Sequence, residues 1–344
     1  MLSALALLLL SPPLGVGSEQ CPPDRPCHGS SAWVDCHAEG LTQVPQGLPH
    51  STRYLDLRDN KLAKLPHLSF NHLWSLRILV LSNAGLQVLQ NKAFCHLYLL
   101  EKLDLSGNEL RRLPADFSEC LSALRELRLA GNALERLDAP SLDGLESLER
   151  LDLGGNRLRT VAPGALRGLA RLRHLRLHGN RLAALPVGAL LSLEVLLLGN
   201  NSLAEISGEA LGSLRALSLL GLEDNRLERL PFAALLSLRT PGTRLRLAGN
   251  PWSCDCDLHH AFGKLRRVRR LAVDDYANVT CRGPPALAGA ALAEVDGRLC
   301  LAETATVLVI TVTVLVTVAA AVVMAEHNRK KGRDSESEDD FQDK

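Results

Sequence analysis

Leucine and asparagine positions recur along most of this chain with a period close to 24 residues. In its full form the pattern reads Leu-x-Leu-x-x-Asn-x-Leu, as in the segment with Leu103, Leu105, Asn108 and Leu110. Nine successive copies of one pattern are typical of a repeat protein, in which every copy forms the same supersecondary unit. The asparagine position of the nine copies falls at Asn60, Ala84, Asn108, Asn132, Asn156, Asn180, Asn201, Asn225 and Asn250.

The Leu-x-Leu part of each copy predicts one short β-strand. Alternate side chains of a strand point to opposite faces, so the leucines enter the core while the residues beside them face outward. The asparagine follows where the chain must turn, and its amide can satisfy backbone groups that have no ladder partner there. A single copy cannot bury its leucines, so the copies must stack as parallel strands with a cap at each end of the stack.

These copies resemble the leucine-rich-repeat family. The resemblance implies an α/β solenoid whose curved parallel sheet lines the concave face, with a continuous ladder of asparagines. Ala84 interrupts the ladder, and Asn83 beside it is expected to substitute in part. The predicted organisation is an N-terminal cysteine cap at 18–52, about eight repeats at 53–249 and a C-terminal cysteine cap at 250–301.

The nine cysteines gather at the two ends of the repeat array. This distribution indicates disulfides that staple the caps, given an oxidising compartment. Cys95 and Cys120 are the exceptions inside the array. They precede Leu103 and Leu127 by eight and seven residues, on the convex segments of adjacent repeats, so stacking should bring them together as a disulfide.

The caps of extracellular family members imply further pairs. Their N-terminal cap usually holds four cysteines, paired first to third and second to fourth; here Cys21 and Cys27 match the first and third, which implies that they are bonded. Arg25 occupies the second position and leaves Cys36, in the place of the fourth, without its partner. With an odd total, either a buried thiol remains at Cys36 or Cys27, or one cysteine bonds another subunit.

The segment from Pro251 to Leu258 is close to the family's C-terminal consensus, and the resemblance implies disulfides Cys254–Cys281 and Cys256–Cys300. As an alternative, Cys254 and Cys256 could bind zinc together with His259 and His260. An oxidising compartment argues against this site, because zinc needs reduced thiols. We expect neither a metal nor a cofactor.

Both chain ends indicate passage through a membrane. Residues 1–17 have the apolar run and small residues of a secretory signal peptide. Residues 304–325 carry no charge and, as a helix, would cross a hydrocarbon core of roughly 30 Å. Basic residues from Arg329 to Arg333 follow the span, so the positive-inside rule predicts a type I protein of the plasma membrane with a cytoplasmic tail at 326–344. The polar tail argues against a glycosylphosphatidylinositol anchor.

Modification motifs fit this topology. The sequons at Asn200 and Asn278 lie on the predicted outer side and are glycosylation candidates. In the tail, Ser335 and Ser337 are surrounded by acidic residues, a context that acidophilic kinases prefer, and are phosphorylation candidates.

Repeat proteins of this family usually bind through the strand face, and the outward positions of the predicted strands supply candidates there. Two groups would expose aliphatic side chains to water, which indicates contact with a partner, whereas single exposed aliphatics are ordinary. The candidate partner-binding residues are Ile78, Val80, Arg128, Asp152, Arg176, Val195, Leu197 and Leu219.

The basic segment from Lys264 to Arg270 lies in the C-terminal cap. It could bind heparan sulfate or anionic lipid, but Leu265, Val268 and Leu271 have helical spacing, which favours an amphipathic cap helix with a solvated basic face. The net charge of the chain is +1, with both signs spread along the repeats, so the composition does not favour a nucleic-acid partner.

Phosphate loops, His-Glu-x-x-His metal motifs and nucleophile elbows are absent from the sequence, so an enzyme is not expected. One predicted function is recognition of an extracellular or membrane protein through the concave face, as an adhesion molecule, ligand receptor or co-receptor. The alternative is an auxiliary subunit of a membrane complex that acts through the span and its basic flank, because the layout also resembles the leucine-rich-repeat γ subunits of potassium channels. The C-terminal cap resembles that of leucine-rich α2-glycoprotein, a shed serum protein, but the span argues against that form.

Overall fold

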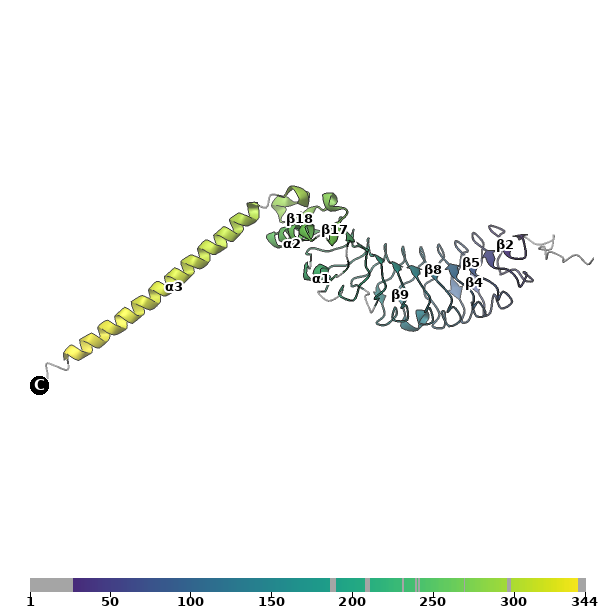
Figure 1. Ribbon diagram of the computed structural model, residues 1–344, viewed down its shortest axis with the longest axis horizontal. Helices are drawn as coiled ribbons and strands as arrows, with labels where there is room; N and C mark the ends of the chain where they lie inside the picture. The colour runs from purple at the N-terminus through teal and green to yellow at the C-terminus, as the bar shows by residue number, and fades with distance from the viewer. Residues whose placement is uncertain are drawn as a thin grey trace, which may run out of the picture.

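The computed structural model describes residues 27–185, 190–207, 211–230, 232–238, 240, 242–268, 270–295 and 298–339. The predicted signal peptide at 1–17 and Cys21 lie outside these residues. The described chain forms a curved solenoid, followed by a long C-terminal helix (Figure 1).

One sheet of twelve strands runs through the described part of the solenoid. Neighbouring strands are parallel, except that β1 and β2 are antiparallel, and nine of the strands come from the nine sequence copies. The predicted α/β solenoid with a parallel sheet is therefore confirmed. In spatial order the strands are β1 (His28–Gly29), β2 (Trp33–Asp35), β3 (Tyr54–Asp56), β5 (Ile78–Val80), β7 (Lys102–Asp104), β8 (Glu126–Arg128), β10 (Arg150–Asp152), β12 (His174–Arg176), β13 (Val195–Leu197), β14 (Leu219–Gly221), β15 (Thr243–Arg246) and β17 (Leu271–Val273).

The segments that connect each strand of the sheet to the next, called return segments below, contain short elements. Two pairs of two-residue strands lie there, β4 (Lys64–Leu65) with β6 (Val88–Leu89) and β9 (Arg136–Leu137) with β11 (Thr160–Val161). The remaining helices of the solenoid and the elements of the C-terminal cap are η1 (Ala139–Leu142), α1 (Phe232–Ser237), β16 (Trp252–Ser253), α2 (Cys256–Arg267), η2 (Tyr276–Asn278), β18 (Cys281–Gly283), η3 (Pro285–Leu287) and η4 (Leu292–Glu294).

The core is a stack of leucines, one layer for each repeat. Each repeat strand contributes a buried leucine, and those of β8 and β10, Leu127 and Leu151, are at most 1% exposed. Phe70, Phe94 and Phe117 add a row of rings, with centroids 5.9 and 5.7 Å apart between successive members. Because every layer repeats the last, burial of a leucine depends on the neighbouring repeats, as expected for a solenoid.

The asparagine ladder satisfies backbone groups where the chain turns. Asn132 donates its amide to the carbonyls of Leu105 and Leu129 at 2.9 and 3.0 Å, and its oxygen accepts the Leu110 N–H at 3.1 Å. At the interruption, the carbonyl of Ala84 itself accepts the Leu62 N–H at 2.7 Å. Asn83 is exposed, so the expected substitution by its side chain was wrong: the backbone fills the gap in the ladder.

The N-terminal cap corrects the predicted pair Cys21–Cys27. Cys27 is bonded to Cys36, with their Cα atoms 4.3 Å apart. The cause is the antiparallel pairing of β1 with β2, which sets His28 opposite Asp35 and therefore Cys27 opposite Cys36. Residues directly opposite in an antiparallel pair are close enough for a disulfide. Cys36 therefore has a disulfide partner. The partner predicted for Cys21, Cys27, is bonded to Cys36 instead.

Other disulfides coincide with expected pairs. Cys95 is bonded to Cys120 across adjacent repeats, and Cys254 to Cys281 in the C-terminal cap, with Cα separations of 5.0 and 5.5 Å. Cys256 is also disulfide-bonded, while the side chain of Cys300 lies outside the described residues. With both Cys254 and Cys256 in disulfides, the alternative zinc site has no thiolate ligands.

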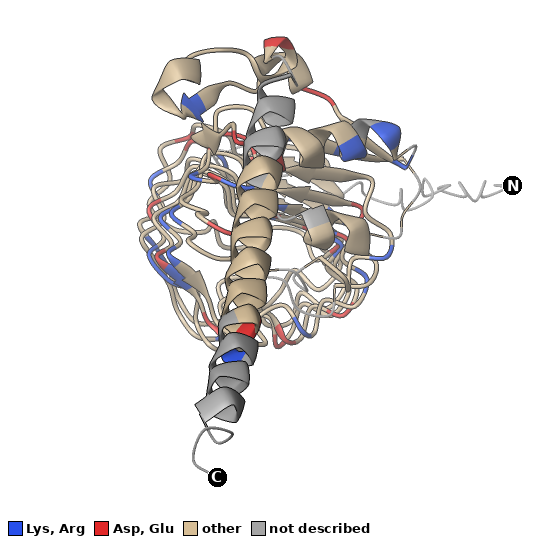
Figure 2. Ribbon diagram, turned by 90° about the vertical axis from the view of Figure 1, so that its left-hand side faces the viewer, with Lys and Arg blue, Asp and Glu red and all other residues tan. Residues whose placement is uncertain are grey.

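The C-terminal helix α3 (Arg298–Asp339) contains the predicted membrane span. By length and composition its segment Leu308–His327 can cross a membrane, and none of that segment is buried against the rest of the chain. Figure 2 shows the middle of α3 free of acidic and basic residues, while both signs are spread over the solenoid. The helix continues into the predicted tail; the side chains of Ser335 and Ser337 lie outside the described residues.

Candidate protein-interaction face

The parallel sheet sorts the outward side chains into rows. In each three-residue repeat strand the first and third residues flank a buried leucine, and the register places equivalent residues of successive repeats side by side. For example, Glu126 pairs with Arg150 and Arg128 pairs with Asp152. The face is therefore a grid in which the sequence period decides which side chains meet.

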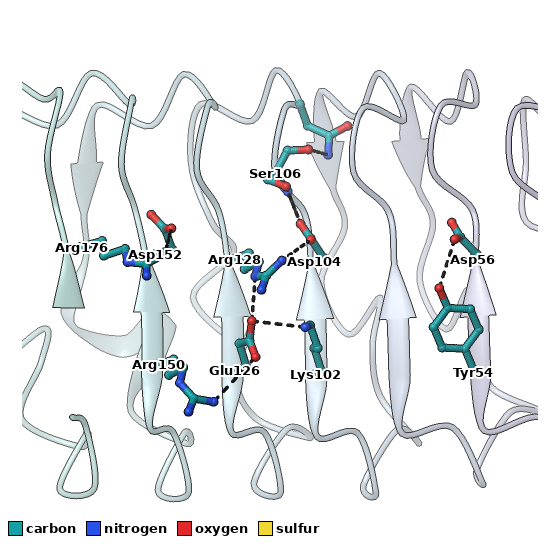
Figure 3. A network of polar contacts seen from close by, with 11 residues as sticks. Tyr54, Asp56, Lys102, Asp104, Ser106, Glu126, Arg128, Arg150, Asp152 and Arg176 are labelled. Carbon is teal, nitrogen blue, oxygen red and sulfur yellow. Dashed lines mark hydrogen bonds and ion pairs between the residues drawn. The ribbon is translucent and has the colours of Figure 1, made fainter. Parts of the chain in front are cut away.

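Glu126 is the centre of an ion-pair network in the middle of this face (Figure 3). Its carboxylate lies 3.4 Å from Lys102 Nζ, 2.7 Å from Arg128 Nε and 4.0 Å from Arg150 Nη1. Three cations from three neighbouring strands thus share one carboxylate. The Glu126 side chain is only 17% exposed, so its charge is largely covered by these partners.

The network extends to both sides. Arg128 also contacts Asp104 at 3.5 Å, and Arg176 contacts Asp152 at 3.3 Å. Arg128, Asp152 and Arg176, predicted as partner-binding residues, line one depression of about 290 Å³ together with Arg150 and others. Exposed ion pairs add little stability, so the main physical effect of the network is to hold these side chains in a fixed arrangement.

An apolar patch, defined as Val195, Leu197 and Leu219, adjoins the network on its C-terminal side. The three side chains are only half-buried although they belong to adjacent central strands β13 and β14. Gly199 and Gly221 leave room beside them, and the Glu223 carboxylate lies over both glycines. Its Oε2 atom is buried and has no hydrogen-bond partner in the described structure. The predicted apolar group therefore forms one surface with the half-buried Glu223 side chain at its border.

The N-terminal end of the face carries aromatic side chains beside Ile78 and Val80, which are both half-buried. Trp33 of β2 is 55% exposed and stacks on Tyr54 of β3 with ring centroids 3.6 Å apart. Burial and the neighbouring Asp56 carboxylate, which accepts a hydrogen bond from the Tyr54 hydroxyl at 3.1 Å, raise the pKa of Tyr54. Tyr54 therefore stays neutral and donates to Asp56.

Sequence reasoning missed Trp33 because the residue lies in the cap. A signal was present: Trp33-Val34-Asp35 repeats the alternation of Tyr54-Leu55-Asp56, and the two strands pair in that register. The cap copy carries no asparagine at the ladder position, where Glu39 stands 21 residues before Asn60, so the search for the full pattern passed over it.

The remaining predicted sites lie outside the strands of this grid. Asn200 and Asn278 are both exposed, the first with a positive φ of 53° directly before the ladder residue Asn201, the second at the end of η2. On α2, Lys264 and Arg267 are exposed while Leu265 is buried. This arrangement is the amphipathic cap helix that the sequence favoured.

Comparison with known proteins defines the class of this chain. A model of the leucine-rich repeat matches residues 50–110 and 122–182. Human 5T4 (Wnt-activated inhibitory factor 1, trophoblast glycoprotein) is 31% identical, with a TM-score of 0.61 over 81% of this chain and 99% of that chain. The chain belongs to the leucine-rich-repeat family, whose solenoids are typically protein-interaction scaffolds.

Two curated relatives match over shorter stretches. Leucine-rich repeat-containing protein 4 of Rattus norvegicus is 38% identical over 65 residues, which are 19% of this chain and 10% of that protein. Leucine-rich repeat and transmembrane domain-containing protein 1 of Mus musculus is 46% identical over 70 residues, 20% of this chain and 18% of that protein. The chain thus spans less than a fifth of the length of either relative.

Proposed function

We propose that the protein is a type I plasma-membrane protein whose ectodomain binds an extracellular or membrane protein through the concave face. The observation that carries the proposal is the apolar patch of Val195, Leu197 and Leu219, whose side chains stay partly exposed on adjacent strands beside a charged network. Contiguous exposed apolar side chains on a folded surface are characteristic of interaction sites.

The surroundings of the patch describe the chemistry of the partner. Arg150 and Arg176 at the edge of the network have side chains more than half exposed, so they suit acidic groups on the rim of the partner. We infer a partner with an apolar centre and an acidic rim; an apolar centre with a polar rim is the usual arrangement of a protein interface.

The other sequence motifs extend this proposal. With the ectodomain outside, Asn200 and Asn278 would carry glycans, and Ser335 and Ser337 would be phosphorylated in the cytoplasm. The exposed cations of α2, Lys264 and Arg267, would contact heparan sulfate or anionic lipid near the membrane.

One observation favours the auxiliary-subunit alternative. The apolar segment Leu308–His327 contacts nothing in the described chain, so all its faces are available to other membrane helices. In that case the partner would be recognised within the membrane and the concave face would be secondary.

A chimera distinguishes the two functions. Partners are captured from intact cells with the full-length protein and with a version in which residues 304–344 are replaced by an unrelated single-span anchor. We expect the chimera to retain the partners of the full-length protein, because recognition resides in the ectodomain. The matched control joins residues 304–344 to an unrelated ectodomain. Partners recovered by this control and lost from the chimera would support the auxiliary-subunit function instead.

A further inference from the structure

A second exposed surface lies on the lateral edge of the solenoid, four residues before each strand. Trp74 and Tyr98 occupy this position in consecutive repeats, and each is 54% exposed. Trp74 stacks on His50, the equivalent residue of the preceding repeat, with ring centroids 4.5 Å apart. Leu99, next to Tyr98, is 48% exposed. We call these residues, His50, Trp74, Tyr98 and Leu99, the aromatic edge.

Exposure of these rings is unusual for this chain. Aromatic residues make up only 3% of the sequence, and the equivalent positions of the next three repeats are Ser122, Glu146 and Ala170. Tryptophan and tyrosine are enriched among the residues that dominate protein interfaces. Neither sequon lies near the aromatic edge in sequence, so the predicted glycans at Asn200 and Asn278 do not account for its exposure.

The position directly before each strand adds a row of alternating charge to the same edge. Arg77 pairs with Glu101, Arg125 with Glu149 at 3.8 Å, and Arg173 with Glu194 at 3.3 Å. All six side chains are at least one third exposed. A row whose sign alternates from repeat to repeat can match a reversed copy of itself, because each arginine then faces a glutamate.

We propose that the aromatic edge binds a second copy of this chain around a two-fold axis between the repeats of β5 and β7. Such an axis places Trp74 against the second copy's Tyr98, and Tyr98 against its Trp74. The same axis places Arg77 against the second copy's Glu101. One two-fold axis therefore pairs both the aromatic and the charged side chains. A two-fold interface requires this self-complementarity. Farther out, the same axis places Arg53 against the second copy's Arg125, a like-charge contact next to the Glu149 carboxylate that pairs with Arg125.

This inference concerns a different surface from the concave face and is independent of the proposed function there. Because the two surfaces share no residue, each can be changed alone. Self-association is measured by energy transfer between two labelled populations of the full-length protein in the plasma membrane, as a function of surface density. The wild-type protein should self-associate.

Charge exchange tests the axis directly. Arg77→Glu alone and Glu101→Arg alone should each weaken self-association at least about tenfold, since each places like charges in contact across the axis. Mixing the two variants should restore energy transfer between them, because the exchanged charges are complementary again in the mixed pair. Arg173→Glu and Glu194→Arg, on the same edge but away from the axis, are the matched controls and should change nothing.

Replacing the aromatic residues is the second test of the proposed interface. Trp74→Ser with Tyr98→Ser should weaken self-association at least about tenfold, while Leu197→Ser with Leu219→Ser on the concave face should leave it unchanged. The proposal is overturned if the wild-type protein is monomeric, if the edge variants associate like the wild type, or if the mixture of Arg77→Glu and Glu101→Arg copies associates no better than either variant alone.

Discussion

Replacing Asn156 by alanine is expected to lower the free energy of unfolding by about 3 kcal/mol. Asn156 is 6% exposed, its amide donates to the carbonyls of Leu129 and Leu153, and its oxygen accepts the Leu134 N–H at 3.1 Å. The carbonyl of Leu129 keeps a second donor, Asn132, at 3.0 Å. The Leu134 N–H can regain only the backbone carbonyl of residue 156, as the Leu62 N–H does at Ala84. The loss therefore comes from the missing amide donations and from the cavity that the side chain leaves.

Urea unfolding of the full-length protein in detergent measures this loss. Trp33 and Trp74 lie near one end of the solenoid and buried Trp252 near the other, so fluorescence reports on both ends of the array. Asn91→Ala is the control: Asn91 is exposed and outside the ladder, and its replacement should change the free energy by less than about 0.5 kcal/mol. Equal stability of the two variants would show that the ladder does not hold the repeats together.

Replacing both Leu197 and Leu219 by serine is expected to weaken binding of the ectodomain's partner at least about a hundredfold. Both side chains are half-buried in the free protein, and the partner is expected to complete their burial. Their removal takes away apolar area that only the complex covers, so binding should suffer far more than folding. The measurement is titration of the partner recovered with the anchor chimera against the full-length protein.

Val88→Ser with Leu236→Ser is the matched control for the patch. These two aliphatic residues are 49% and 37% exposed, and they belong to the return-segment elements β6 and α1. Their replacement removes similar apolar area from a surface that the proposed partner does not touch, and binding should stay at the wild-type level. Wild-type affinity of the Leu197→Ser, Leu219→Ser variant would remove the patch from the interface.

The periodic part of the fold was predictable because a solenoid converts sequence period directly into spatial register. Leu127 and Leu151 are 24 residues apart and pair in adjacent strands as that spacing requires. The N-terminal cap was not predictable in the same way. Its cysteines were assigned by likeness to a four-cysteine cap, whereas the pairing of Cys27 with Cys36 follows from a local antiparallel turn that the repeat pattern does not describe.

For the interaction face, the sequence supplied positions but not contacts. The period identified Arg128, Asp152 and Arg176 as outward residues, yet their pairing depends on side-chain reach across strands. Glu126, the centre of the network, was visible only as one outward position among many. Trp74 lies outside the strand positions, and its exposure depends on how the edge packs, which period alone does not decide.

Radical footprinting of the full-length protein, with and without the partner recovered by the anchor chimera, tests concave-face recognition most directly. Hydroxyl radicals modify exposed side chains, so a residue covered by the partner loses reactivity. We expect protection of Leu197 and Leu219, with unchanged reactivity at Val88 and Leu236 on the return segments. Protection confined to the segment Leu308–His327, with full reactivity of the patch, would contradict it.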